Sequence, residues 1–99
     1  MSEIIIPFKQ WSKERLKDNK RATSRTTVYG KIGDTFIVDG IKYDIVGVIK
    51  LPLDFVINHL YSVEGAESSY ELDIVFNNIF KNKPLPNWVY VHFFESVDE

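Results

Sequence analysis

The chain has 99 residues, 44% of them hydrophobic and 14% aromatic, with a net charge of −2; this is typical of one globular domain and excludes a disordered chain. Because there is no cysteine, disulfides, thiol nucleophiles and cysteine-ligated zinc are excluded. No apolar run reaches the ~18–20 residues of a membrane span, and no signal peptide is recognisable, so we expect a single domain over residues 1–99 that is cytoplasmic and has no membrane partner.

The first third of the chain predicts a strand, a helix and a loop. Three isoleucines at positions 4–6 precede Pro7, and this pattern predicts a short strand that ends at the proline. Residues 9–18 are rich in good helix formers and predict a helix. Residues 19–34 are polar and contain two glycines, which predicts a long loop with a short extended piece.

The middle of the chain predicts a β-hairpin. β-Branched runs at 35–38 and 41–49 flank Asp39-Gly40, and both residues of such a turn require positive φ, which Asp-Gly tolerates. Apolar and polar residues alternate at the start of the second run, as expected for a half-buried strand. Gly47 interrupts this alternation and indicates a bulge or a bend.

Two amphipathic helices are predicted after the hairpin. Pro52 suits the first turn of a helix, and apolar residues follow at helical spacing over 53–61. Ser68 and Glu71 have the spacing of a capping box, and a second helix is predicted over 69–81, ending before the prolines at positions 84 and 86.

An alternating aromatic run at 88–94 predicts a final strand. The order is strand, helix, loop, hairpin, two helices and strand, without regular βαβ alternation, which favours an α+β fold. A mostly antiparallel sheet, curled into a small β-barrel and flanked by helices, satisfies these elements.

Common catalytic constellations are missing from the sequence. The two histidines, His59 and His92, lie 33 residues apart in a predicted helix and a predicted strand, so a structural role is expected for each. No phosphate-binding glycine motif occurs. The carboxylates do not have the spacing of a metal-binding loop, so we expect no cofactor and no resident metal, while transient binding of Mg²⁺ or Mn²⁺ stays open because such ions need few protein ligands.

The candidate site lies in the basic part of the chain. Residues 9–31 hold eight Lys or Arg against two acidic residues, and residues 32–99 hold four against eleven; such a segment can attract a local anion, although a solvated basic helix has the same composition. If the segment after Lys20 is extended, Thr23 and Arg25 point to one face and Ser24 to the other. Glu64, in the connector between two predicted helices, is a plausible counter-charge for Lys20.

Several short motifs together resemble the ASCH family of the PUA-like superfamily. These are the K-x-x-T-x-R segment from Lys20 to Arg25, Gly33-Asp34 before a strand, the IVGV strand at 45–48, Glu64-Gly65 and the VYVHFF end at 89–94. The resemblance covers roughly residues 5–94. Asp18 stands where the family's motif usually has a glycine before the lysine.

The resemblance implies a PUA-like β-barrel with a cleft for RNA or its components. Some small bacterial ASCH proteins remove the acetyl group from N4-acetylcytidine, and their catalytic Lys, Thr and Glu match Lys20, Thr23 and Glu64. Other members are RNA-binding, coactivator-associated or ribonuclease-like, so the family alone does not select one function. We therefore expect an RNA- or nucleoside-binding domain that hydrolyses an acyl amide. The alternatives are a non-catalytic RNA-binding module and a metal-dependent ribonuclease.

In the hydrolytic interpretation, the Thr23 hydroxyl attacks the amide carbonyl after a base takes its proton. Lys20 is that base if it is neutral, whereas Glu64 can instead shuttle the proton or hold the cytosine amine. Arg25 binds a phosphate or stabilises the oxyanion, and neither cation is expected in the core. The residues predicted to contact the substrate or RNA are Trp11, Arg21, Arg25, Tyr29 and Tyr61. The sequence predicts no oligomeric state.

Overall fold

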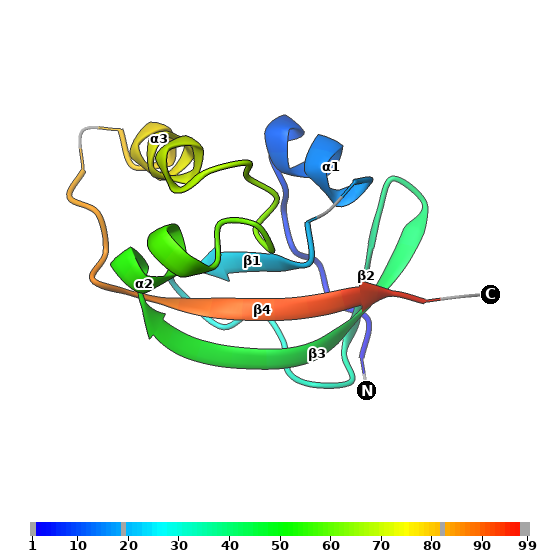
Figure 1. Cartoon of the computed structure of the whole chain (residues 1–99). Helices are drawn as coiled ribbons and strands as arrows, with labels where there is room; N and C mark the ends of the chain where they lie inside the picture. The colour runs from blue at the N-terminus through cyan, green and yellow to red at the C-terminus, as the bar shows by residue number, and fades with distance from the viewer. Residues whose placement is uncertain (1, 19, 82, 98–99) are drawn as a thin grey trace.

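The computed structural model describes residues 2–18, 20–81 and 83–97. The elements in chain order are α1 (Gln10–Leu16), β1 (Ala22–Arg25), β2 (Thr35–Val38), β3 (Ile41–Pro52), α2 (Leu53–His59), α3 (Ser69–Ile79) and β4 (Trp88–Ser96) (Figure 1). The predicted α+β fold is confirmed, with helices, hairpin and last strand close to the predicted positions.

The strands form one antiparallel sheet in the order β1-β4-β3-β2. The sheet is curled into a half-barrel, and Figure 1 shows the helices over the side on which β1 lies. The long strand β3 pairs with β2 at its start and with β4 along most of its length. The short strand β1 pairs only with β4 and is therefore an edge strand.

The turn and the bulge that shape the sheet lie where the sequence predicts them. Asp39 and Gly40 have φ values of 51° and 81°, as a two-residue hairpin turn requires. The register of β3 against β4 shifts between Ile45 and Gly47. This bulge bends β3, so its two ends can belong to different parts of the curved sheet.

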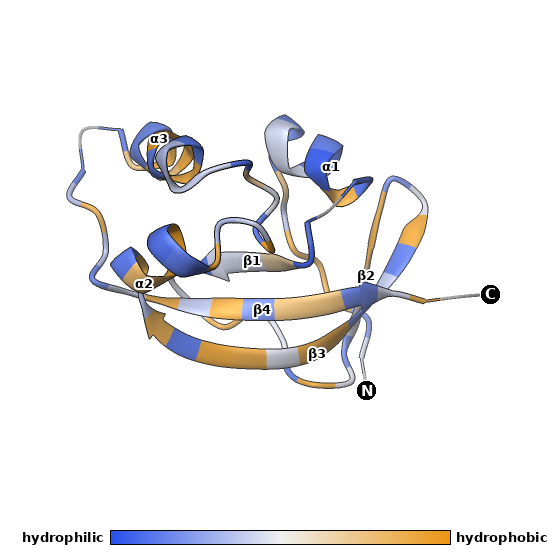
Figure 2. Cartoon of the chain, viewed as in Figure 1, coloured by the Kyte–Doolittle hydropathy of each residue, from blue (hydrophilic) through white to orange (hydrophobic). Residues whose placement is uncertain are grey.

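Two apolar clusters lie on opposite faces of β4, since alternate residues of a strand point to opposite sides. Val89 and Val91 pack with α2 and α3, whereas Phe94 packs with Phe36 and Tyr43 of the hairpin. Figure 2 shows apolar residues spread along β3 and β4, and β4 contributes buried residues to both clusters.

The predicted strand at residues 4–6 is wrong. The N-terminal segment makes only an isolated parallel bridge, Glu3 with Thr35, in which the Ile4 N–H donates to the Thr35 carbonyl at 2.7 Å. The chain then leaves the sheet edge, because Ile6 is buried in the hairpin-side cluster. Ile4 and Ile6 thus anchor the segment by packing while Ile5 is exposed, and the composition of the run alone does not distinguish this from a strand.

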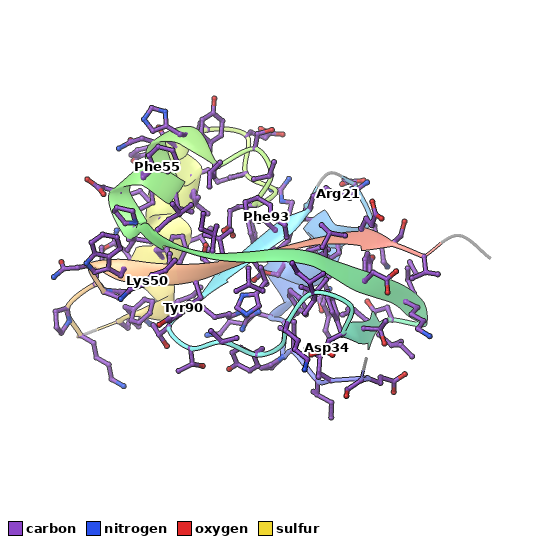
Figure 3. All side chains as sticks on the ribbon, turned by 90° about the horizontal axis from the view of Figure 1, so that it is seen from below. Arg21, Asp34, Lys50, Phe55, Tyr90 and Phe93 are labelled. Carbon is purple, nitrogen blue, oxygen red and sulfur yellow. The ribbon has the colours of Figure 1, made fainter. Side chains whose placement is uncertain are left out.

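Asp34 holds the N-terminal segment and the loop before β2 together (Figure 3). Its carboxylate accepts hydrogen bonds from the backbone N–H groups of Lys31 and Ser2, both at 3.0 Å. The bond from Lys31, followed by the bond from Ser2, holds the pKa of Asp34 below its ordinary value. The Gly-Asp pair of the sequence motif therefore acts structurally at this position.

Helix α3 begins at a cap that also places α1. The Ser68 hydroxyl accepts from the Glu71 N–H at 3.1 Å, while the Glu71 carboxylate accepts from the Glu67 N–H at 2.9 Å. Glu71 also pairs with Arg15 of α1, 3.4 Å away. This half-exposed pair contributes about 0–1 kcal/mol, but it links the two helices that form the walls of the site.

Gly65 lets the connector between α2 and α3 pass close to the end of α1. Its φ is +99°, and a Cβ at this position would lie 2.8 Å from the Arg15 Cβ and 3.0 Å from the Lys20 Cβ. Any side chain would therefore be strained by the backbone angle and would also collide with its neighbours. This close approach brings the preceding residue, Glu64, against Lys20.

The glycine requirement is testable by alanine substitution. We expect Gly65→Ala to lower the free energy of unfolding by about 2–4 kcal/mol, because left-handed strain of ~1–2 kcal/mol adds to the overlap. Gly40→Ala, with positive φ but nothing within 4 Å, should show only the strain, and Gly47→Ala, which has neither problem, should change little. Urea unfolding measures all three, and equal losses in Gly65→Ala and Gly40→Ala would contradict the close approach.

Candidate functional site

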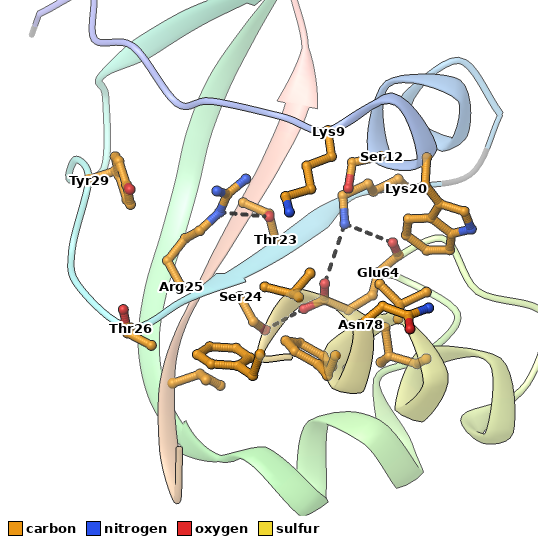
Figure 4. A pocket seen from close by; sticks show the side chains of 17 residues that line it. Lys9, Ser12, Lys20, Thr23, Ser24, Arg25, Thr26, Tyr29, Glu64 and Asn78 are labelled. Carbon is orange, nitrogen blue, oxygen red and sulfur yellow. Dashed lines mark hydrogen bonds and ion pairs between the residues drawn. The ribbon is translucent and has the colours of Figure 1, made fainter. Parts of the chain in front are cut away.

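A cavity of about 400 Å³ opens between α1, the edge strand β1 and α3 (Figure 4). Apolar residues of α3, among them Leu72, Val75 and Phe76, form one wall. The other wall is polar and comes from α1, β1 and the α2–α3 connector. The cavity is accessible because β1 has no strand beyond it on this side.

Lys20 and Glu64 form a buried ion pair in the polar wall. They are only 2% and 3% exposed. The Lys20 Nζ donates to the Glu64 backbone carbonyl at 2.8 Å and approaches its Oε1 at 3.3 Å. The expectation that Lys20 lies outside the core is therefore wrong. The turn at Gly65 packs against the side chain of Lys20. A contact between residues 45 positions apart leaves no pattern in the local sequence.

Opposing effects act on the charge of Lys20. Burial lowers the pKa of Lys20, and the positive charge of Arg25 adds to this effect. The attraction and hydrogen bond of Glu64 act in the opposite direction but do not overcome burial, so the pKa lies below the ordinary lysine value of 10.5.

Ser24 is a member of the site that the sequence analysis assigned to the opposite face. Its hydroxyl donates to Oε2 of Glu64, so both carboxylate oxygens are held, one by Ser24 and one by Lys20. Strand alternation does place Ser24 opposite Thr23 and Arg25. Since β1 is an edge strand, however, the cavity wraps around it and is lined from both faces.

Thr23 and Arg25 lie side by side on the other face of β1. The Arg25 Nε donates to the Thr23 Oγ1 at 3.2 Å, and the guanidinium lies between the rings of Phe8 and Tyr29, 5.1 and 5.6 Å from their centroids. Burial lowers the pKa of Arg25, with a partial offset from Tyr29 and Glu64. Thr23 makes no side-chain hydrogen bond to Lys20 or Glu64 within the described ranges.

The predicted aromatic and arginine contacts divide into two groups. Trp11 and Tyr29 line the cavity, and the ammonium of Lys20 lies 5.9 Å from the Trp11 ring centroid. Tyr61 and Arg21 do not line it. Tyr61 packs against the α2–α3 core cluster, and the exposed Arg21 turns back to donate to the Lys20 carbonyl at 2.9 Å.

His92 lies beneath the site in strand β4 and holds the backbone of Tyr29, a residue that lines the cavity. These contacts agree with its predicted structural role. It is fully buried; its Nε2 accepts from the Tyr29 N–H and its Nδ1 donates to the Tyr90 carbonyl, both at 3.0 Å. Burial lowers the pKa of His92, so the neutral ring is favoured. In contrast, His59 is exposed on α2, where its ring lies 4.9 Å from that of Phe55.

Residues 2–18, 20–81 and 83–97 contain no group of three or more His, Asp or Glu side chains arranged to hold a metal ion. In the same part of the chain, none of the helices combines the length and the apolar character needed to cross a membrane.

Comparisons with known proteins bear on the fold alone. Neither the protein-family models nor the curated proteins match this sequence. Solved structures do. An ASCH domain from Lactobacillus crispatus JV V101 superposes with a TM-score of 0.69 at 14% identity, over 96% of this chain and 78% of that chain.

Two further structures are similar. The hypothetical protein PH0355 has a TM-score of 0.68 at 15% identity, over 98% of this chain and all of the other. Protein EF3133 from Enterococcus faecalis V583, of the family DUF984, has a TM-score of 0.62 at 19% identity, over 98% and 79% of the two chains. The chain therefore has the ASCH-like, PUA-like fold, and its function must be argued from the site.

Removing one charge of the buried pair should destabilise the protein strongly. We expect Lys20→Met to cost about 3–5 kcal/mol, because it leaves the Glu64 carboxylate buried without its cation. The double variant Lys20→Met/Glu64→Gln should recover part of this loss, since no charge remains unpaired. Urea unfolding at neutral pH measures both. Lys17→Met, at an exposed position, is the control and should change the free energy of unfolding by no more than about 0.5 kcal/mol. If the double variant loses as much as Lys20→Met and Glu64→Gln lose separately in sum, the two side chains are not coupled.

His92 should make stability depend on pH. Because its pKa is lower in the folded than in the unfolded chain, the unfolded chain binds more protons below the ordinary value of about 6.5. The free energy of unfolding should therefore fall as pH falls through this value toward the folded pKa. Urea midpoints between about pH 5 and 8 should show this slope in the wild type and in His59→Gln but not in His92→Gln. An unchanged slope in His92→Gln would assign the effect to another group.

Proposed function

We propose that this ASCH-like chain binds a nucleoside unit, free or within RNA, and hydrolyses an acyl amide on its base, with N4-acetylcytidine as the sharpest candidate substrate. The observation that carries the proposal is the buried Lys20–Glu64 pair in the wall of a cavity that Thr23 also lines. The resemblance of the Lys20–Arg25 segment and Glu64 to small amidohydrolases supplies the choice of substrate.

Burying an ion pair costs folding free energy that a chain of 99 residues has little margin to supply. Taking two charges out of water costs several kcal/mol per ion, and a well-packed apolar pair is often at least as stable. Lys20 and Glu64 face a cavity rather than the middle of the core, and a lysine whose pKa is lowered by burial in a cleft is typical of functional sites. Their position therefore supports a chemical role more than a structural one.

The cavity suits one nucleoside. Its volume of about 400 Å³ lies within the ~300–1,000 Å³ range of small-molecule sites, which combine apolar walls with a few placed polar groups. The apolar wall of α3 would contact the base, with Trp11 as a stacking surface. The opposite wall presents Thr23, Lys20 and Glu64 to the amide.

The proposed reaction starts with neutral Lys20 taking the proton of the Thr23 hydroxyl. The Thr23 oxygen attacks the amide carbon, the C–N bond breaks, and the cytidine amino group leaves with the proton returned by Lys20. Water then hydrolyses the acyl ester, which releases acetate and restores Thr23. Arg25, already bonded to the Thr23 oxygen, would lie beside the attacked amide and stabilise the negative charge that develops on its carbonyl oxygen.

The hydrogen bonds of Lys20 and Glu64 show which side chain must move when the substrate binds and which can stay in place. Lys20 is bonded to Glu64 rather than to Thr23, so its amine must turn toward Thr23 when the substrate binds; catalytic hydrogen bonds often tighten only in the complex. Glu64 keeps its place through Ser24, and its carboxylate can accept the N–H of the cytosine amide.

A non-catalytic RNA-binding module is the second candidate. The observation that favours it is that Lys9 and Arg25 line the cavity without a carboxylate within 4.0 Å in the described residues, which suits contact with a phosphate. Binding that depends on phosphate contacts weakens steeply with salt, whereas turnover of a neutral nucleoside should depend on salt little. No arrangement of the described residues favours the metal-dependent ribonuclease.

Turnover of N4-acetylcytidine tests the proposal. The purified protein should release cytidine without added metal, and the rate should rise with pH as Lys20 loses its proton. Thr23→Val should reduce kcat by about 10³-fold or more, because nucleophile and base act as one unit, while it still binds cytidine. Thr23→Ser, which keeps a hydroxyl, is the matched control and should retain activity.

Two outcomes would change this assignment. A rate equal to that of buffer across about pH 6–9, where a perturbed lysine base titrates, would refute the hydrolytic chemistry. Activity that survives Thr23→Val but is lost in Glu64→Gln would instead assign the attack to water, with Glu64 as the base.

A further inference from the structure

We propose that Arg25 and Lys9 form an anion subsite beside the cavity that takes one phosphate group of a nucleotide. The preferred ligand is then a phosphorylated nucleoside or a nucleotide within RNA, rather than a free nucleoside. The identity of the base rests on the proposed function, whereas the subsite rests on the placement of these two cations.

The guanidinium of Arg25 is held in place on two sides, while its two terminal nitrogens are free. The aromatic rings of Phe8 and Tyr29 lie against the guanidinium, and Nε is used in the bond to Thr23. The two terminal nitrogens make no hydrogen bond to the described residues. Since no buried side-chain nitrogen in the described part lacks a partner, these terminal groups keep some solvent-accessible surface.

The residues that hold Arg25 are themselves fixed by contacts within the sheet. Tyr29 is fixed through its backbone, because its N–H donates to the Nε2 of the buried His92. The backbone of Arg25 belongs to β1 and is paired with Tyr90 of β4. The orientation of the guanidinium is therefore set before any ligand arrives, which reduces the entropy that binding must overcome.

Lys9 supplies a second positive charge on the same side. It immediately precedes α1 and lines the cavity, and Figure 4 shows its side chain directed into the cavity in the region between Arg25 and Lys20. Glu64, the acidic residue of the lining, is already paired with Lys20. Lys9 and Arg25 therefore leave this side of the cavity positively charged.

The chemistry of this pair fits a phosphate. A planar guanidinium with two free terminal nitrogens binds a phosphate through two parallel hydrogen bonds, and an ammonium adds a mobile point charge. The Arg25 Nε serves the Thr23 oxygen, so one residue can meet the acyl group on one edge and a phosphate on the other. This arrangement would place the phosphate next to the nucleoside whose base lies against α3.

Calorimetric titration at constant ionic strength tests the subsite with cytidine, its 5′- and 3′-monophosphates, the dinucleotide cytidylyl-cytidine and inorganic phosphate. We expect at least one phosphorylated ligand to bind the wild type at least about tenfold more tightly than cytidine, since a hydrogen bond between charged groups raises affinity by at least this factor. The ligand with the largest gain identifies the phosphate that is recognised, terminal or within a chain.

The matched pair of variants is Lys9→Gln and Lys13→Gln, because Lys13 lies in α1, four residues after Lys9, but lines a different hollow. Lys9→Gln should weaken the phosphorylated ligand by about fivefold or more and leave cytidine unchanged, and Lys13→Gln should affect neither. Equal weakening by both variants, or equal affinity of cytidine and all phosphorylated ligands for the wild type, would overturn the subsite.

Failure of the subsite can be told apart from failure of the proposed function. Hydrolysis of N4-acetylcytidine without any gain from a phosphate would refute the subsite alone. Binding of inorganic phosphate that is lost in Lys9→Gln but kept in Lys13→Gln, without any nucleoside binding, would support the subsite and refute the nucleoside proposal.

Discussion

The buried ion pair between Lys20 and Glu64 is the contact on which the site depends. It joins the segment after α1 to the connector between α2 and α3, and it forms only because Gly65 lets these backbones approach closely. The Glu64 carboxylate is then shared between Lys20 and Ser24. The close turn at Gly65 therefore determines how the charged groups in the polar wall of the cavity are paired, oriented and buried.

A second set of contacts organises the opposite face of β1. Neutral His92 accepts from the backbone of Tyr29, the Tyr29 ring covers Arg25, and Arg25 holds Thr23. Each contact restricts the next, so a side chain buried in β4 contributes to the position of a hydroxyl at the cavity. The two sets meet at the edge strand β1, which has cavity-lining side chains on both faces.

What the sequence did not predict has one physical cause, contacts between distant segments. Strand alternation correctly placed Ser24 opposite its two neighbours in β1, but it did not indicate that Ser24 lines the cavity, because a cavity at a sheet edge is lined from both faces. The polarity of Lys20 suggested exposure, but a counter-charge 44 residues away permits burial. The isoleucines at positions 4–6 had the composition of a strand, although the sheet edge offers them a single bridge at Glu3. Tyr61 was counted with the cavity because its place in the helix packing was unknown.

The sequence by itself determined the local elements, since the hairpin turn at Asp39-Gly40, the bulge at Gly47 and the cap at Ser68 depend on backbone preferences of residues close in the chain. It also indicated the K-x-x-T-x-R segment as the place to look for chemistry. Only the tertiary structure decided which of those polar groups are buried, which are paired and which stay free for a ligand. Burial and charge pairing arise from contacts between segments far apart in the chain, and no local pattern encodes them.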